Sequence, residues 1–363
     1  MTGMAVAVTF VVVLVGLANG LSKSMLKLYV DRGVSLIVTD KGSLNPLSGT
    51  INAAVAEEIE RLPGVSKTCA GLVDFQQNED LGDQVGIQGW PAGNYMFNEL
   101  KKPGTKDPVL PDLDPGPKGI VVGITLANAK SLKVGQAITI ADDKFTIRGI
   151  FESDQDLENP MVVMRLDEAQ HVLGKTGKMT GCTVNVTDTS EAAVAAVRAE
   201  IEGPIADRFG LTGKLRAKPP GEFVKQNSQV KLLTAFAWLV SIVTLIISGI
   251  LVLNTMFMAV FERTREIGIL RAIGWRPSRV MRMILSESIL LSVGGGIIGT
   301  VGGLAAIKFL GYVPTVSGIV QQAISVDIVV KGFAIAIIVG LIGAAYPAYR
   351  GSRLLPTEAL RHE

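Results

Sequence analysis

The sequence predicts a membrane protein with four transmembrane helices and an α+β domain inserted between the first and second helices. Charged residues make up only 19% of the chain and the mean hydropathy is +0.39, whereas soluble domains carry roughly 25% charged residues. Apolar runs of about 20 residues cross a hydrocarbon core of roughly 30 Å as helices. Four such runs, or nearly so, are Met4–Gly20, Leu232–Val260, Met283–Ile307 and Ile328–Tyr349.

These runs set the predicted boundaries. The order along the chain is a first span at 1–21, an inserted domain at 22–221, a stalk with the second span at 222–260, a polar loop at 261–282, a third span at 283–309, a short loop at 310–327, a fourth span at 328–349 and a tail at 350–363.

The distribution of basic residues predicts the orientation. The loop at 261–282 is rich in arginine and the tail is basic, whereas 310–327 contains no Lys or Arg. Basic loops stay on the cytoplasmic side, so we expect a multi-pass protein of the cytoplasmic (inner) membrane with both termini in the cytoplasm and residues 22–221 outside. The first run could instead be a signal peptide cut after "LANG". It lacks the positively charged flank of such peptides, and we predict a retained helix.

The inserted domain reads as mixed α and β. "VSLIVTD" predicts a strand, and "INAAVAEEIERLPGV" predicts a helix closed by Pro63-Gly64. Residues 119–165 predict a small β-rich subdomain with a hairpin at Asp142-Asp143. A second helix is expected at Ser190–Gly203, followed by a stalk helix that starts near Glu222 and continues into the second span.

Few residues suggest catalysis. The two histidines, His171 and His362, fall on opposite predicted sides of the membrane, which excludes a zinc site built from both. "GKTGKM" departs from the phosphate-binding loop because the first glycine and the final Ser/Thr are missing. We expect no enzyme activity, metal or cofactor on this chain. Cys69 and Cys182 either form a disulfide or stay as separate buried thiols, and the sequence leaves both open.

Small residues recur at four-residue spacing in the third and fourth spans. Gly295, Gly299 and Gly303 form one row, and Gly340 belongs to a similar row in the fourth span. Such rows let helix backbones approach closely in lipid. We predict that spans three and four pack on each other, with a dimer interface as the alternative. Glu287, at the start of the third span, is expected near Arg282.

The arginine-rich loop has more order than a charge anchor needs. The second span is expected to continue to a break at Gly268, after which "ILRAIG" forms a short helical segment that Gly274 closes. Pro277 suits the first turn of the next helix. Ile269, Leu270 and Ile273 then share an apolar side. This pattern fits either a plain membrane anchor or a docking element for a cytoplasmic partner.

The loop, the third span, the C-terminal end and part of the inserted domain resemble a known family. "ERTREIGILRAIGW", "RVMRMILSESILL", "GGGIIGTVGG" and the closing "YPAYRGSRLLPTEALR" are similar to the MacB/FtsX-type ABC transporter permeases. "GIVVGITLANAKSLKVGQAITIADDKFTIRGIF" resembles the β-rich part of that family's periplasmic core domain. The resemblance covers nearly the whole chain. The amphipathic segment that usually precedes the first span in the family has no counterpart here.

The resemblance implies a non-catalytic permease subunit. It would pair with a second permease copy, as a homodimer or heterodimer, and with a separate cytoplasmic ATPase that binds ATP and Mg²⁺. It would transmit the closing of the ATPase to the outer domain, with a periplasmic adaptor or lipoprotein as a further possible partner. The coupling residues implied are Arg265, Glu266, Ile269, Leu270, Arg271 and Ile273.

Two other functions remain open from the sequence. One is an FtsX-like regulator that acts on an outer partner such as a cell-wall hydrolase and transports nothing. The other is a membrane-anchored enzyme or receptor whose outer domain acts alone. The absence of a catalytic motif and the ordered arginine loop both count against the second.

Overall fold

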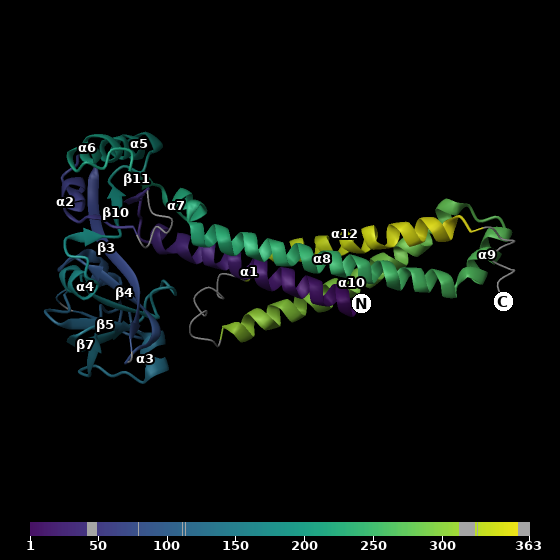
Figure 1. Cartoon of the computed structure of the whole chain (residues 1–363), viewed down its shortest axis with the longest axis horizontal. Coiled ribbons are helices and arrows are strands. Elements are labelled where there is room, and N and C mark those ends of the chain that lie inside the picture. Colours follow the sequence, from purple (N-terminus) through teal and green to yellow (C-terminus); the bar gives the residue numbers. More distant parts are fainter. Residues whose placement is uncertain are drawn as a thin grey trace. The chain divides into compact units, whose positions relative to one another are not determined.

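The computed structural model describes residues 1–41, 49–78, 80–110, 112, 114–311, 324 and 326–354. The chain divides into two compact units, shown with the rest of the chain in Figure 1. The helical unit takes its described residues from 1–20, 233–312 and 320–363, and the α/β unit takes its described residues from 21–232. Most of the predicted loop at 310–327 and of the tail at 350–363 lies outside the described residues.

Within the described residues, four helices are long and apolar enough to cross a membrane, as predicted: α1 (Thr2–Val30), α8 (Ser228–Glu262), α10 (Pro277–Leu310) and α12 (Val326–Ser352). These helices extend beyond the predicted spans. The 35 residues of α8 make about 52 Å of helix, against roughly 30 Å of hydrocarbon. The most apolar stretch of α1 is 56% buried and that of α8 only 17%, so α8 leaves most of its apolar surface for lipid or another protein.

At two places where the sequence predicts one continuous helix, the helix is interrupted. The stalk is a separate helix, α7 (Pro220–Gln226), because Asn227 adopts an extended ψ of 123° between it and α8. The Asn227 side chain accepts hydrogen bonds from the backbone N–H groups of Gln229 and Val230, at 2.9 and 3.3 Å. It therefore caps the start of α8, whose first N–H groups have no helical partner. Likewise, α8 ends at Glu262 and does not reach Gly268.

The α/β unit is built on one sheet of nine strands in the order β11-β1-β10-β3-β4-β8-β5-β7-β6. The predicted β-rich segment at 119–165 is not a separate sheet, because β8 pairs in parallel with β4. β2 and β9 form a separate two-stranded ladder. The strands are β1 Leu36–Asp40, β2 Ile51–Asn52, β3 Val65–Asn78, β4 Gly82–Trp90, β5 Gly119–Gly123, β6 Ala137–Ile140, β7 Asp143–Phe151, β8 Met161–Arg165, β9 Lys178–Met179, β10 Gly181–Val186 and β11 Leu215–Lys218.

Short helices complete the unit. The predicted hairpin is confirmed by the antiparallel pair β6–β7. The predicted helix at 51–65 is shorter than expected, because Ile51 and Asn52 form β2. The second predicted helix begins after Ser190, whose hydroxyl accepts a hydrogen bond from the Ala193 N–H. The helices are α2 Ala54–Glu60, η1 Tyr95–Glu99, α3 Ile124–Lys130, α4 Leu166–Val172, α5 Glu191–Glu200, η2 Ile201–Ile205 and α6 Ala206–Arg208.

The two cysteines are free and buried. In the β10–β3 pair, Cys182 lies opposite Ala70 and Thr183 lies opposite Cys69. Directly opposed residues share a face of a sheet and successive residues alternate, so the two thiols point to opposite faces. Of the two possibilities that the sequence left open, the structure has separate buried thiols.

Candidate partner-docking site

The loop between the second and third spans contains a helix of its own, α9 (Thr264–Ala272). It starts directly after the end of α8 and contacts α12 within the helical unit (Figure 1). Gly274, with φ of +99°, closes it. The N–H of Gly274 donates to the Arg271 carbonyl and the N–H of Trp275 donates to the Leu270 carbonyl, each at 3.1 Å. This is the Schellman pattern, and Pro277 then opens α10 as predicted.

One side of α9 is fixed in the helical unit. Ile267 is only 2% exposed and packs in a cluster with residues of α8, α10 and α12. Arg271, one helical turn further on, is half-buried, and its guanidinium donates to the Trp275 carbonyl at 2.8 Å. Arg271 therefore helps to close the helix end. The cluster contains Met256, Val260, Ile267, Val280, Ile284, Ala344 and Ala348.

The opposite side of α9 is exposed. Ile269 is 44% exposed and Ile273 is 73% exposed, and Arg265 and Glu266 are exposed as well. Residues four apart share one side of a helix, so Arg265, Ile269 and Ile273 form a single row. Leu270 is half-buried between the two sides. Of the six coupling residues implied by the resemblance, four are therefore exposed.

An ion pair holds the start of α9 to α10. The Arg263 guanidinium donates to both carboxylate oxygens of Glu287, at 3.2 and 3.0 Å. The sequence placed Glu287 near Arg282 but did not predict its ion pair with Arg263. After α9, the Arg279 guanidinium stacks over the Trp275 ring at 4.8 Å. Neither contact was predicted. Arg263 and Glu287 come from different parts of the chain, and Trp275 lies in the turn before α10, outside the helix that contains Arg279.

The glycine row of α10 packs on α1. A Cβ added at Gly299 would lie 2.5 Å from the Ala5 carbonyl oxygen, and one at Gly303 would lie 2.8 Å from a Val12 methyl group. Gly295 meets Met4 in the same way. The expected partner of this row was the fourth span, so that part of the prediction is wrong.

Spans three and four also pack together, through other residues. Gly340 of α12 lies against Ser292 of α10, and the Ser288 hydroxyl donates to the Gly340 carbonyl at 2.9 Å.

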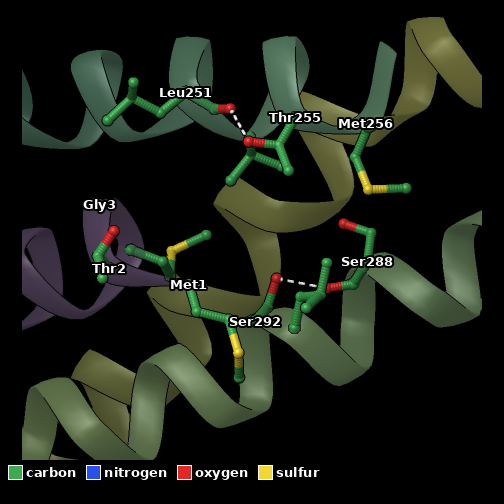
Figure 2. A pocket seen from close by; sticks show the side chains of 11 residues that line it. Met1, Thr2, Gly3, Leu251, Thr255, Met256, Ser288 and Ser292 are labelled. Carbon is green, nitrogen blue, oxygen red and sulfur yellow. Dashed lines mark hydrogen bonds between the residues drawn. The ribbon is translucent and has the colours of Figure 1, made fainter. Parts of the chain in front are cut away.

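A small cavity of about 130 Å³ lies among α1, α8 and α10 within the helical unit (Figure 2). Two of its hydroxyl groups donate to their own helices: Thr255 donates to the Leu251 carbonyl and Ser292 to the Ser288 carbonyl, each at 2.8 Å. The Ser288 hydroxyl donates to the Gly340 carbonyl of α12. Among the residues that the structure describes, no group of three or more His, Cys, Asp or Glu side chains could hold a metal ion.

Four apolar helices, an α/β domain inserted after the first, and a short helix between the second and third define a multi-pass membrane protein. Two family profiles match in the same order: the MacB-like periplasmic core domain at residues 1–203 and the FtsX-like permease C-terminal family at residues 238–356. The first covers more than half of the chain. The chain belongs to the MacB/FtsX-type ABC transporter permeases, which confirms the family seen in the arginine-rich loop.

Similar curated proteins include a macrolide export ATP-binding/permease protein MacB of Wolinella succinogenes, 24% identical over 99% of this chain and 57% of its own length. A pyoverdine export ATP-binding/permease protein PvdT of Pseudomonas syringae is 28% identical over 99% of this chain and 56% of its own length. An uncharacterized ABC transporter permease, MJ1507 of Methanocaldococcus jannaschii, is 28% identical over 64% of this chain and 59% of its own length. The chain thus spans less than two thirds of these relatives.

Two solved structures are similar to the chain. The periplasmic region of MacB from Actinobacillus actinomycetemcomitans matches with a TM-score of 0.42 and 11% identity, over 54% of this chain and 94% of its own. The extracellular domain of the transporter YknZ from Gram-positive bacteria matches with a TM-score of 0.39 and 12% identity, over 51% of this chain and 98% of its own.

Proposed function

We propose that this chain is the membrane subunit that couples ATP hydrolysis by a separate ATPase to movement of its α/β unit, and so drives export or extraction of a substrate. The observation that carries the proposal is the division of α9 into a fixed side and an exposed apolar side. Ile267 fixes α9 in a cluster with residues of α8, α10 and α12, and the exposed Arg263–Glu287 pair adds a weak contact. A push on α9 would therefore be passed on to α8 and α10.

The exposed row suits a protein partner. Fully burying one Ile side chain stabilises a protein or a complex by about 1.5–3 kcal/mol. Ile269 and Ile273 are largely exposed, so a partner that covers them would gain much of this free energy. Helix-in-groove contacts use such anchors, and the arginines around them favour an acidic rim. We assign this face to the ATPase, on the cytoplasmic side that the basic loop predicts. ATP and Mg²⁺ would bind to that partner.

The names of the relatives support export. MacB and PvdT are named as exporters of macrolides and of pyoverdine, and both names combine an ATP-binding part with a permease. We propose the same kind of work here with a substrate of unassigned class. The FtsX-like regulator gains no such support. A second permease copy is expected to pack on the exposed apolar face of α8, and an adaptor or lipoprotein is a further expected partner.

A pull-down tests the docking face. In mild detergent the wild-type chain should recover an ATPase, whereas the double variant Ile269→Glu with Ile273→Glu should lose it and remain in the membrane. The matched control is Val134→Glu, which makes the same change at a 60% exposed apolar residue of the α/β unit. If the double variant recovers as much ATPase as the control, α9 is only an anchor and the proposal is wrong.

A further inference from the structure

The α/β unit has a second, larger cavity of about 400 Å³ that is partly open to solvent, and this volume lies within the usual range of small-molecule sites. Its wall comes from the end of α1, from strands β1, β3, β4 and β10, and from α7. Most of the wall is apolar, with Tyr29, Phe75, Trp90, Met96, Met161 and Phe223 among its side chains. Methionine side chains adapt to the shape of a ligand.

One polar atom in this wall lacks a partner. The Gln88 side-chain oxygen is buried and makes no hydrogen bond within the described part of the chain. Leaving such a group unpaired costs about 1–3 kcal/mol. The neighbouring Thr180 hydroxyl shows the usual arrangement, because it accepts from the Val73 N–H at 3.0 Å and donates to the Val73 carbonyl at 3.2 Å. The Gln88 oxygen is therefore available to accept a hydrogen bond from a ligand.

The charges of the wall cancel. Arg32 and Glu158 both line the cavity, and their side chains are 5% and 2% exposed. The Arg32 guanidinium donates to both carboxylate oxygens of Glu158, at 2.7 and 2.6 Å, and the Ser153 hydroxyl donates to one of them at 2.8 Å. The pair is satisfied internally. An ionic ligand would have no counter-charge here and would lose several kcal/mol of solvation.

Glycine keeps the cavity open. A Cβ added at Gly71 of β3 would meet nothing closer than the Gly181 carbonyl oxygen at 3.8 Å. Glycine inside a strand often marks a place where a ligand approaches. The small cavity of the helical unit differs, since its Thr255, Ser288 and Ser292 hydroxyls are already bonded.

We propose that this cavity binds an uncharged, mainly apolar small molecule that carries a hydrogen-bond donor for Gln88. The proposal concerns the α/β unit alone and does not depend on the coupling of α9 to an ATPase, so the two proposals fail separately.

The test uses the full chain in lipid nanodiscs with N-phenyl-1-naphthylamine, an uncharged aromatic amine with one N–H. The chain has three tryptophans, and Trp238→Phe with Trp275→Phe leaves Trp90, in the cavity wall, as the energy donor to the probe. Saturable quenching of Trp90 is expected. Gly71→Leu should weaken binding at least tenfold. Gly221→Leu, at a glycine with equally open surroundings outside the wall, should leave binding unchanged.

A second variant separates the hydrogen bond from the fit. Gln88→Leu keeps the volume and removes the acceptor, so it should weaken the amine probe about 2- to 12-fold, the range for one neutral hydrogen bond. It should leave 1-benzylnaphthalene, in which CH₂ replaces the N–H, unchanged. Quenching that never saturates, or that is equal in Gly71→Leu and Gly221→Leu, overturns the proposal. Should Gly71→Leu fail to fold, an equal effect of Gln88→Leu on both probes is decisive against it.

Discussion

Glycine has a different structural role in each of the two units: it allows close packing in one and borders a cavity in the other. In the helical unit, Gly299 lets the backbone of α1 come so close that an added Cβ would lie 2.5 Å from the Ala5 carbonyl oxygen. In the α/β unit, a Cβ added at Gly71 would make only an ordinary van der Waals contact, 3.8 Å from the Gly181 carbonyl oxygen. The helices of the helical unit therefore pack closely at positions without a side chain. The α/β unit instead buries large apolar side chains and the Arg32–Glu158 ion pair, and it leaves a cavity beside Gly71. In lipid, helices gain from close approach, whereas a domain in water gains from buried apolar area.

The largest loss of stability is expected from breaking the buried Arg32–Glu158 pair of the α/β unit. Glu158→Ala leaves the buried Arg32 without its carboxylate, and removing one partner of a buried pair costs about 3–5 kcal/mol. Asp154→Ala, a few residues away, removes a carboxylate that is 77% exposed in its pair with Lys101 and should cost at most about 1 kcal/mol. Thermal unfolding of both variants checks this. Equal losses would mean that the Arg32–Glu158 pair is not buried in solution.

The next effect separates the two sides of α9. Ile267→Ala should cost about 2–5 kcal/mol of unfolding free energy, because it empties a site in the packed cluster. Ile273→Ala should change stability by less than about 0.5 kcal/mol, since this side chain is 73% exposed. Unfolding in mild detergent measures both. A costly Ile273→Ala would show that the exposed row already packs on another part of the chain.

The glycine comparison itself is tested by the same small change at two places. Gly299→Ala should cost about 1–3 kcal/mol, as overpacking does, because the Ala5 backbone cannot move aside. Gly71→Ala should be nearly neutral, because its surroundings are open. Thermal unfolding of the two variants gives the answer. If Gly71→Ala is the more harmful, the cavity is closed in solution.

The smallest effect concerns the thiols. Burial raises the pKa of Cys69 well above its usual value and that of Cys182 to about 12. Both should resist maleimide in the folded protein at pH 7–8 and react after unfolding. The neutral thiols stabilise the fold fully below about pH 9, the usual thiol pKa, and this contribution is lost as pH rises toward the folded values. Rapid native labelling would contradict the buried placement.

The sequence predicted the membrane spans, the inserted domain and the short loop helix, because apolar length, arginine placement and the Gly274 and Pro277 signals are local. It did not predict contacts that depend on which helices meet. The partner of Gly299 is α1 and not α12, and Glu287 pairs with Arg263. The apolar set in the loop was visible, but only packing shows that Ile267 points inward while Ile273 points outward. Asn227 was overlooked as a helix start because apolar periodicity continues on both sides of it.

The most direct test of the central claim is the side of the membrane on which α9 lies. With Cys69 and Cys182 replaced by alanine, a cysteine at Ile273 should react with a membrane-impermeant maleimide in inverted vesicles and not in right-side-out spheroplasts. A cysteine at Val134, in the α/β unit, should show the reverse. Labelling of position 273 from the outside would contradict the account, because no cytoplasmic ATPase could then reach α9.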